Sequence, residues 1–302
     1  MHTSAHPPFY PMILLLFPLM LSLNNNYLLV NGSGAETWDY PNIFEKNVID
    51  GEKAPIDRYP YHATINIRQS KKKDELYNVC GGSLIHRNWI VTAAHCIDSN
   101  NMDLVVEIGR DSYRQSVDSI YEVRDIKSKC AHPFFNPINF QYDIALLYFE
   151  DGIDNIDPVP IDTHNVDLTS YSKRNQRPSP LRVIGYGSTS IFGDGPYPNR
   201  LQEADVYYIN DKQCENVVRN TGADMFTDWT MCASGFGIQD TCIGDSGGPL
   251  LIPSRKGDTL VGVVSIGPVP CMEADTPVLY TRISKAYDWI MNVIDGDTDL
   301  CK

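Results

Sequence analysis

Short apolar runs separated by turn-forming residues recur along the chain from about residue 48 to its end. Such runs, bounded by Gly, Pro, Asn and Asp, are typical of β-strands, and many of them in succession favour a barrel or a sandwich. The pattern therefore predicts an all-β fold. The predicted strands are Tyr61–Ile67, Leu104–Ile108, Ile144–Phe149, Leu181–Tyr186, Ala204–Ile209, Leu260–Ile266 and Val278–Arg282.

Few segments have a helical pattern. Residues Asn210–Arg219 predict one short helix, and a second, amphipathic helix is predicted near the C-terminus with Ser284 as its cap. We expect this second helix to dock on the body of the protein. Its apolar residues at helical spacing are Tyr287, Ile290, Met291 and Ile294.

An apolar run near the N-terminus, Met12–Leu23, is too short to span a bilayer and has the size of a signal-peptide core. No Lys or Arg precedes it, and the small-residue cleavage signal near Val30 to Ala35 is vague. We interpret residues 1–34 as a signal peptide and expect a secreted, extracellular protein. A membrane anchor is the alternative.

Composition supports a folded, soluble domain. The chain has 302 residues, of which 42% are hydrophobic, so a full core is available. Its formal net charge of −13 argues against nucleic acid as a partner, because binding phosphates requires a basic face.

Eight cysteines indicate disulfides and an oxidising compartment. Their spacing alone does not assign the pairs. The chain has no paired Cys-x-x-Cys with matching histidine spacing, so a zinc site is not expected.

The stretch Cys242–Leu250 reads Cys-Ile-Gly-Asp-Ser-Gly-Gly-Pro-Leu and places Ser246 between glycines. Glycines allow a tight turn and a close approach of a substrate, because no β-carbon stands in the way. A serine nucleophile also needs a general base and backbone N–H donors for the oxyanion. Glycine with serine is more often an ordinary turn, so the motif needs partners elsewhere in the chain.

Two such partners precede it. His95 ends the run Trp-Ile-Val-Thr-Ala-Ala-His, and Asp143 stands immediately before the apolar run Ile-Ala-Leu-Leu. A carboxylate at the start of a buried strand is costly unless it is paired, and a histidine is the natural partner.

Together, these segments resemble the trypsin- and chymotrypsin-like serine protease family. The order His95, Asp143, Ser246 is the order of chymotrypsin and differs from that of subtilisin and the α/β-hydrolases. The resemblance extends from Val48 to about Ile294. It implies two six-stranded antiparallel β-barrels with a C-terminal helix, an active site between the barrels, and a crossing segment near Asp162–Pro180.

The resemblance also implies a role for each residue. Ser246 would be the nucleophile, His95 the general base and then acid, and Asp143 the group that orients the imidazole. The N–H groups of Gly244 and Ser246 would form the oxyanion hole. No cofactor is implied, and no calcium is expected at Arg110, where trypsin's calcium loop begins with glutamate.

The family pattern pairs six of the cysteines, and the remaining two, Cys130 and Cys301, are predicted to bond to each other. Alternatively, Cys301 is free or bridges to another chain. The implied pairs are Cys80–Cys96, Cys214–Cys232 and Cys242–Cys271.

Residues 35–47 are interpreted as a propeptide, and residues 48–302 as the protease domain. In the family, cleavage frees an amino group, here that of Val48, which pairs with the aspartate before the nucleophile, here Asp245. The residue before Val48 is Asn47 rather than Arg or Lys. Two routes are therefore proposed: an asparagine-specific protease, or a cut after Lys46 followed by trimming.

Asp240 occupies the position at the floor of the family's primary specificity pocket, and a carboxylate there implies cleavage after Lys or Arg. Gly267 would leave one pocket wall open. Val278 stands where trypsin-like members carry glycine, so we expect a narrowed slot that favours Lys over Arg. Ser265 belongs to the strand that would pair with substrate backbone, and Ile266 replaces the usual tryptophan.

Two classes of function remain at this point. The first is a secreted serine endopeptidase that is made as a zymogen and is monomeric. Its substrates would be proteins or peptides, and its partners an activating protease and possible protease inhibitors. The second is a protease-like binding protein that has lost turnover, because Val278, Ile266 and Asn47 all depart from the family pattern. The order of the triad disfavours a lipase or esterase on another fold.

Overall fold

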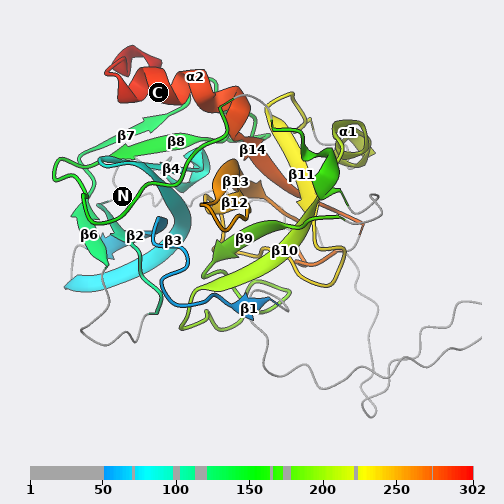
Figure 1. Ribbon diagram of the computed structural model, residues 1–302, viewed down its shortest axis with the longest axis horizontal. Coiled ribbons are helices and arrows are strands. Elements are labelled where there is room, and N and C mark those ends of the chain that lie inside the picture. Colours follow the sequence, from blue (N-terminus) through cyan, green and yellow to red (C-terminus); the bar gives the residue numbers. More distant parts are fainter. Residues whose placement is uncertain are drawn as a thin grey trace, which may run out of the picture. The chain divides into compact units, whose positions relative to one another are not determined.

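The computed structural model describes residues 51–69, 72–97, 103–112, 121–163, 166–172, 178–220, 224–273 and 275–301. These residues form two β-sheets, two α-helices and three short 3₁₀ turns (Figure 1). All of them belong to one compact unit, Phe44–Lys302. The predicted leader, the predicted propeptide and Val48 lie outside the described residues.

The first sheet contains seven antiparallel strands in the order β6-β5-β2-β3-β4-β8-β7. Its centre is apolar because all residues of β5 are buried, as are the first three of β8. The strands are β2 (His62–Gln69), β3 (Lys72–His86), β4 (Trp89–Thr92), β5 (Leu104–Ile108), β6 (Glu122–Asp125), β7 (Ser128–Ala131) and β8 (Ala145–Tyr148).

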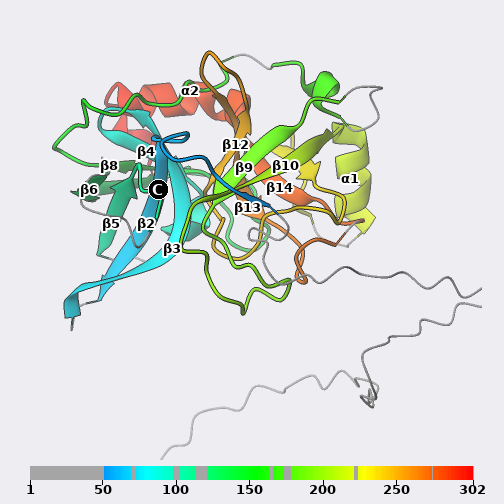
Figure 2. The same ribbon diagram turned by 60° about the horizontal axis from the view of Figure 1, so that its bottom comes forward.

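Six strands of the second sheet close into a barrel, because β9 pairs with both β10 and β12. A short strand, β1, pairs with the first two residues of β10. The strands are β1 (Glu52–Lys53), β9 (Leu181–Gly185), β10 (Gln202–Ile209), β11 (Thr230–Ser234), β12 (Pro249–Ile252), β13 (Thr259–Ile266) and β14 (Val278–Arg282). Figure 2 shows the two sheets beside each other.

The all-β class with a C-terminal helix is confirmed, and all seven predicted strands are present with shifts of two residues or fewer at each end. Of the two expected six-stranded antiparallel barrels, the second sheet forms one that is closed. In the first sheet, no pairing among the described residues joins β6 to β7, so that sheet forms an open, curved half-barrel. The crossing segment Asp162–Pro180 connects β8 to β9, as expected.

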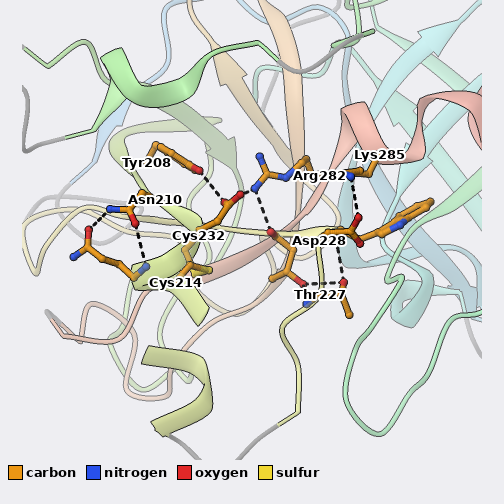
Figure 3. Close-up of polar contacts among 12 residues, drawn as sticks. Tyr208, Asn210, Cys214, Thr227, Asp228, Cys232, Arg282 and Lys285 are labelled. Atoms are coloured by element: carbon orange, nitrogen blue, oxygen red, sulfur yellow. Dashed lines mark hydrogen bonds and ion pairs between the residues drawn. A yellow bond between two sulfur atoms is a disulfide. The ribbon is translucent and has the colours of Figure 1, made fainter. Parts of the chain in front are cut away.

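Helix α1 (Asp211–Asn220) begins one residue after the predicted start. The side chain of Asn210 accepts a hydrogen bond from the Gln213 backbone N–H (3.1 Å), and the Gln213 side chain accepts one from the Asn210 amide, so the first turn has a reciprocal cap (Figure 3). The helix is fixed to β11 by the disulfide Cys214–Cys232.

Helix α2 (Ile283–Ile294) starts immediately after β14. The predicted cap was wrong: Ser284 lies inside the first turn, and the cap residue is Arg282, whose side chain instead donates to Asp211 (2.5 Å) (Figure 3). The helix needs no side-chain cap because its apolar face is buried. The buried residues are Ile283, Ala286, Trp289, Ile290 and Val293.

The C-terminal tail is fixed to the first sheet. Cys301 forms a disulfide with Cys130 of β7, and the Leu300 carbonyl accepts a hydrogen bond from the Trp289 indole (3.0 Å). In the part of the chain that the structure describes, no helix is long and apolar enough to cross a membrane.

Candidate active site

His95 lies in a 3₁₀ turn, Ala94–Cys96, directly after β4. Cys96 in the same turn is bonded to Cys80 of β3, so the turn is fixed to the sheet on both sides of His95. The imidazole remains about one quarter exposed. Its edge also faces the ring of Phe140, with the two ring centroids 5.6 Å apart.

Asp143 is fully buried and its carboxylate accepts three hydrogen bonds. The His95 imidazole donates through Nδ1 (2.7 Å), and the His95 backbone N–H donates to the other oxygen (2.9 Å). The third donor is the Ser265 hydroxyl of β13 (2.6 Å). A buried carboxylate is stable when its oxygens are satisfied in this way, and the arrangement holds the second imidazole nitrogen, Nε2, free to accept a proton.

These contacts connect the two sheets. His95 and Asp143 come from the first sheet, whereas Ser265 and Thr281 belong to the second. The Thr281 hydroxyl donates to the Asp143 backbone carbonyl (2.7 Å). The candidate site therefore lies at the junction of the two sheets, as the family resemblance implied.

Ser246 reaches the same junction on the loop before β12. Its backbone carbonyl accepts from the Gly81 N–H (2.8 Å). Gly247 has a φ of +79°, and a β-carbon there would lie 2.2 Å from the Thr92 hydroxyl oxygen. Only glycine allows this approach, which places Ser246 against the strand end that leads to His95.

The Ser246 hydroxyl and the His95 imidazole share no hydrogen bond among the described residues, and Nε2 of His95 lies 3.8 Å from Cys96 Sγ. In proteases, this hydrogen bond is commonly long until substrate binds. The geometry therefore provides an oriented imidazole, and Ser246 is a half-buried residue on the loop that packs against the strand end before His95.

Asp245, the residue before Ser246, is buried. It accepts hydrogen bonds from the N–H groups of Gly187 (2.8 Å) and Cys242 (3.0 Å). Burial raises the pKa of its carboxyl group to about 6. A β-carbon at Gly185 or Gly187 would lie within 2.3 Å of its carboxylate oxygens, so glycine is required at both positions.

The Asp240 carboxyl group is also buried, with 1% of the residue exposed. It accepts from the Thr241 N–H (2.9 Å) through one oxygen, and the other has no partner among the described residues. Burial raises its pKa to about 7. One methyl group of Val278 lies 3.1 Å from the point that a β-carbon on Gly267 would occupy, so these two residues are in close contact.

All eight cysteines are paired, and the four disulfides are the predicted ones, including Cys130–Cys301. Cys242–Cys271 joins the Ser246 loop to the loop after Gly267.

Sequence reasoning missed three features of the site. The first is the hydroxyl of Ser265, which donates to Asp143; the assignment of Ser265 to the strand that would pair with substrate backbone stays a prediction. The support from Thr281 and the ring contact of Phe140 were not anticipated. Phe140 has a φ of +55°, which no local pattern indicates because this conformation usually belongs to Gly or Asn.

Comparison with known proteins gives a consistent result. The family model described as Trypsin matches residues 48–290. The chain is 30% identical to "Trypsin" of Phaedon cochleariae, over 83% of this chain and 88% of that protein, and 30% identical to "Trypsin 5G1" of Aedes aegypti, over 82% and 84%. It is 29% identical to "Serine proteinase stubble" of Drosophila melanogaster, of which it spans about a third (31%).

Proposed function

The chain belongs to the trypsin family of serine endopeptidases, and we propose that His95, Asp143 and Ser246 carry out its reaction in a secreted enzyme made as a zymogen. The observation that carries this proposal is the set of hydrogen bonds around Asp143, because it fixes the imidazole with one nitrogen directed away from the carboxylate.

In the proposed mechanism, the Ser246 hydroxyl attacks the carbonyl carbon of the substrate while His95 accepts its proton. Asp143 stabilises the resulting imidazolium without itself taking the proton. The N–H groups of Gly244 and Ser246 stabilise the oxyanion, His95 then protonates the leaving amine, and water hydrolyses the acyl-enzyme.

A serine-directed covalent probe tests this proposal against the alternative of an inactive binding protein. We expect a chain that begins at Val48 to be labelled at Ser246, and the Ser246→Ala variant and unfolded protein to remain unlabelled. A folded chain without label at Ser246 would favour the binding protein.

Activation is proposed to occur between Asn47 and Val48, by an asparagine-specific protease or by a cut after Lys46 followed by trimming. Support comes from the buried Asp245 carboxylate, for which the described residues supply N–H donors but no cationic side chain. N-terminal sequencing of active protein is the direct check, and a start other than Val48 would contradict the proposal.

Secretion is supported by four disulfides, which persist in oxidising compartments. One relative, 31% identical, is named a venom serine protease, and another, 30% identical, a transmembrane protease. We propose a soluble, monomeric extracellular enzyme with protein or peptide substrates and with protease inhibitors as possible partners.

We propose cleavage after basic residues, with Lys favoured over Arg. Asp240 supplies the negative charge, and Val278 limits the width of the slot. The ammonium of Lys is a compact charge on a thin stem, whereas the guanidinium of Arg is broad and planar.

Replacing Val278 by Gly is expected to raise kcat/KM for an Arg peptide by about tenfold, because a steric overlap of this kind costs on the order of 1–3 kcal/mol. The gain for the matched Lys peptide is expected to be smaller. Steady-state kinetics on both peptides measure the effect. Equal gains, or a wild-type preference for large apolar residues, would contradict the narrowed basic slot.

The preference for a Lys side chain over an uncharged side chain of the same shape is expected to depend on pH near 7. Below the Asp240 pKa of about 7, the carboxyl group is protonated and neutral, so its attraction for an ammonium is lost, and above it the group is ionised. The ratio of kcat/KM for a Lys peptide to that for an uncharged isostere should therefore rise with pH through 7. Taking the ratio cancels the titration of the triad. In Asp240→Asn the ratio should be flat.

A further inference from the structure

Large apolar side chains are exposed around the Ser246 loop. Phe192 is 61% exposed, Tyr197 57% and Val269 65%, and Ile191 and Ile243 are also more than 40% exposed. Leaving such groups in water forgoes the stability that burial would give, and clusters of them mark binding surfaces.

Contacts between their loops connect these side chains, which together we call the apolar rim (Ile191, Phe192, Tyr197, Ile243 and Val269). A β-carbon on Gly193 would lie 2.2 Å from the Ile243 side chain, so Ile243 rests on the loop that bears Phe192. The Cys271 N–H donates to the Ile191 carbonyl (2.7 Å), two residues after Val269.

The rim continues into the catalytic site. A β-carbon on Gly244 would lie 3.2 Å from the Tyr197 ring, so this ring covers the glycine assigned to the oxyanion hole. The Ser188 N–H donates to the Ile243 carbonyl (2.7 Å), which fixes the Tyr197 loop to the Ser246 loop.

The loop is held in shape by its own hydrogen bonds. The Thr189 hydroxyl donates to the Pro196 carbonyl (2.9 Å), the Gly193 N–H donates to the Ser190 carbonyl (2.9 Å), and the Ser190 hydroxyl donates to Asp194 (2.8 Å). Phe192 is therefore presented on an ordered turn. A preorganised apolar surface loses less entropy on binding than a flexible one.

We propose that the apolar rim binds large apolar side chains of a protein substrate on the C-terminal side of the scissile bond. This inference rests on the proposed function. In that function, the acyl side of the substrate runs along Ser265–Gly267 at the end of β13 and fills the Asp240 slot. The part of the rim next to Gly244 (Phe192, Tyr197 and Ile243) is therefore left for the residues after the cleaved bond. The five rim side chains are uncharged, and the carboxylate of Asp194, two residues after Phe192, already accepts a hydrogen bond from the Ser190 hydroxyl.

The test compares two peptides that are identical up to the scissile bond and carry either Phe-Leu or Gly-Gly after it. We expect wild-type protein to cleave the Phe-Leu peptide about ten- to a hundred-fold more efficiently, the range expected for burying one large apolar side chain. In Phe192→Ser, the ratio should fall by about tenfold. Ile56→Ser is the matched control, because it removes a similarly exposed side chain (67%) that is not part of the rim, and it should keep the wild-type ratio.

Active-site titration with the serine-directed probe separates the two proposals. Absence of label in the wild-type chain that begins at Val48, the form used in all of these assays, would refute the proposed function. Two outcomes with full labelling would overturn the role of the rim and leave the proposed function intact. One is a wild-type ratio of Phe-Leu to Gly-Gly cleavage near one. The other is a ratio that stays unchanged in a Phe192→Ser, Ile243→Ser double variant. Loss of binding to neutral lipid vesicles in Phe192→Ser, with the peptide ratio unchanged, would assign the rim to a lipid surface and also overturn the proposal.

Discussion

Asp143→Asn is expected to lower kcat by about 10⁴, the loss typical of this substitution in a Ser-His-Asp triad. The amide can accept through only one of its two terminal atoms, whereas the Asp143 carboxylate accepts from His95 Nδ1, the His95 N–H and the Ser265 hydroxyl. In the variant, the amide NH₂ group has two possible effects. It either faces one of these donors and leaves it without an acceptor, or it donates to Nδ1 and moves the imidazole proton to Nε2. An imidazole protonated on Nε2 is no longer a base for Ser246.

Steady-state kinetics and probe labelling measure this loss, and two variants serve as controls. Ser265→Ala removes one donor to the same carboxylate but leaves the His95 contacts, so its effect should be much smaller. Asp228→Asn breaks an exposed ion pair with Lys285 (2.8 Å) and should leave kcat near the wild-type value (Figure 3). An Asp143→Asn protein that is folded and retains more than a tenth of wild-type turnover would exclude Asp143 from the proposed triad.

The polar network around Asp143 also shows where sequence reasoning reaches its limit. The position of Asp143 before an apolar strand indicated a buried, paired carboxylate, and the structure confirms both features. The sequence did not identify Ser265 and Thr281 as its partners, because they come from strands more than 120 residues away and their pairing depends on how the two sheets meet.

The strands show the same difference between what local sequence predicts and what long-range contacts decide. Isolated apolar runs such as Leu104–Ile108 were predicted with the observed ends. The longest strand, β3 (Lys72–His86), was missed because it begins with charged residues and contains Gly81 and Gly82, which break the local pattern. Those glycines are required by tertiary packing: a β-carbon on Gly81 would lie 2.9 Å from the backbone of Gly248. Local propensity is overruled here by a long-range contact.

Cleavage before Val48 is expected to raise turnover by about 10²–10³, the contribution of an ordered oxyanion-hole donor. Asp245 and Gly244 are adjacent, so the position of the Asp245 carboxylate determines where the Gly244 N–H points. The Asp245 carboxylate is buried and accepts hydrogen bonds only from N–H groups among the described residues. Burial raises its pKa to about 6, because the ionised form has no positive charge beside it. Pairing with the Val48 amino group would stabilise the ionised form and fix the loop.

The experiment compares three proteins: the uncut chain, a chain that begins at Val48, and a chain that begins at Asn47. One extra residue displaces the amino group by about 3.8 Å, so the third protein should remain as slow as the uncut chain. Asp245→Asn in the Val48 chain should remove the gain, because the ammonium then has no counter-charge. Because the α-amino group has an ordinary pKa of about 8, raised further by pairing, the gain should also fall at strongly alkaline pH, where the amine loses its charge. Equal turnover of the uncut chain and the Val48 chain would exclude this switch and would leave the buried Asp245 as a purely structural group.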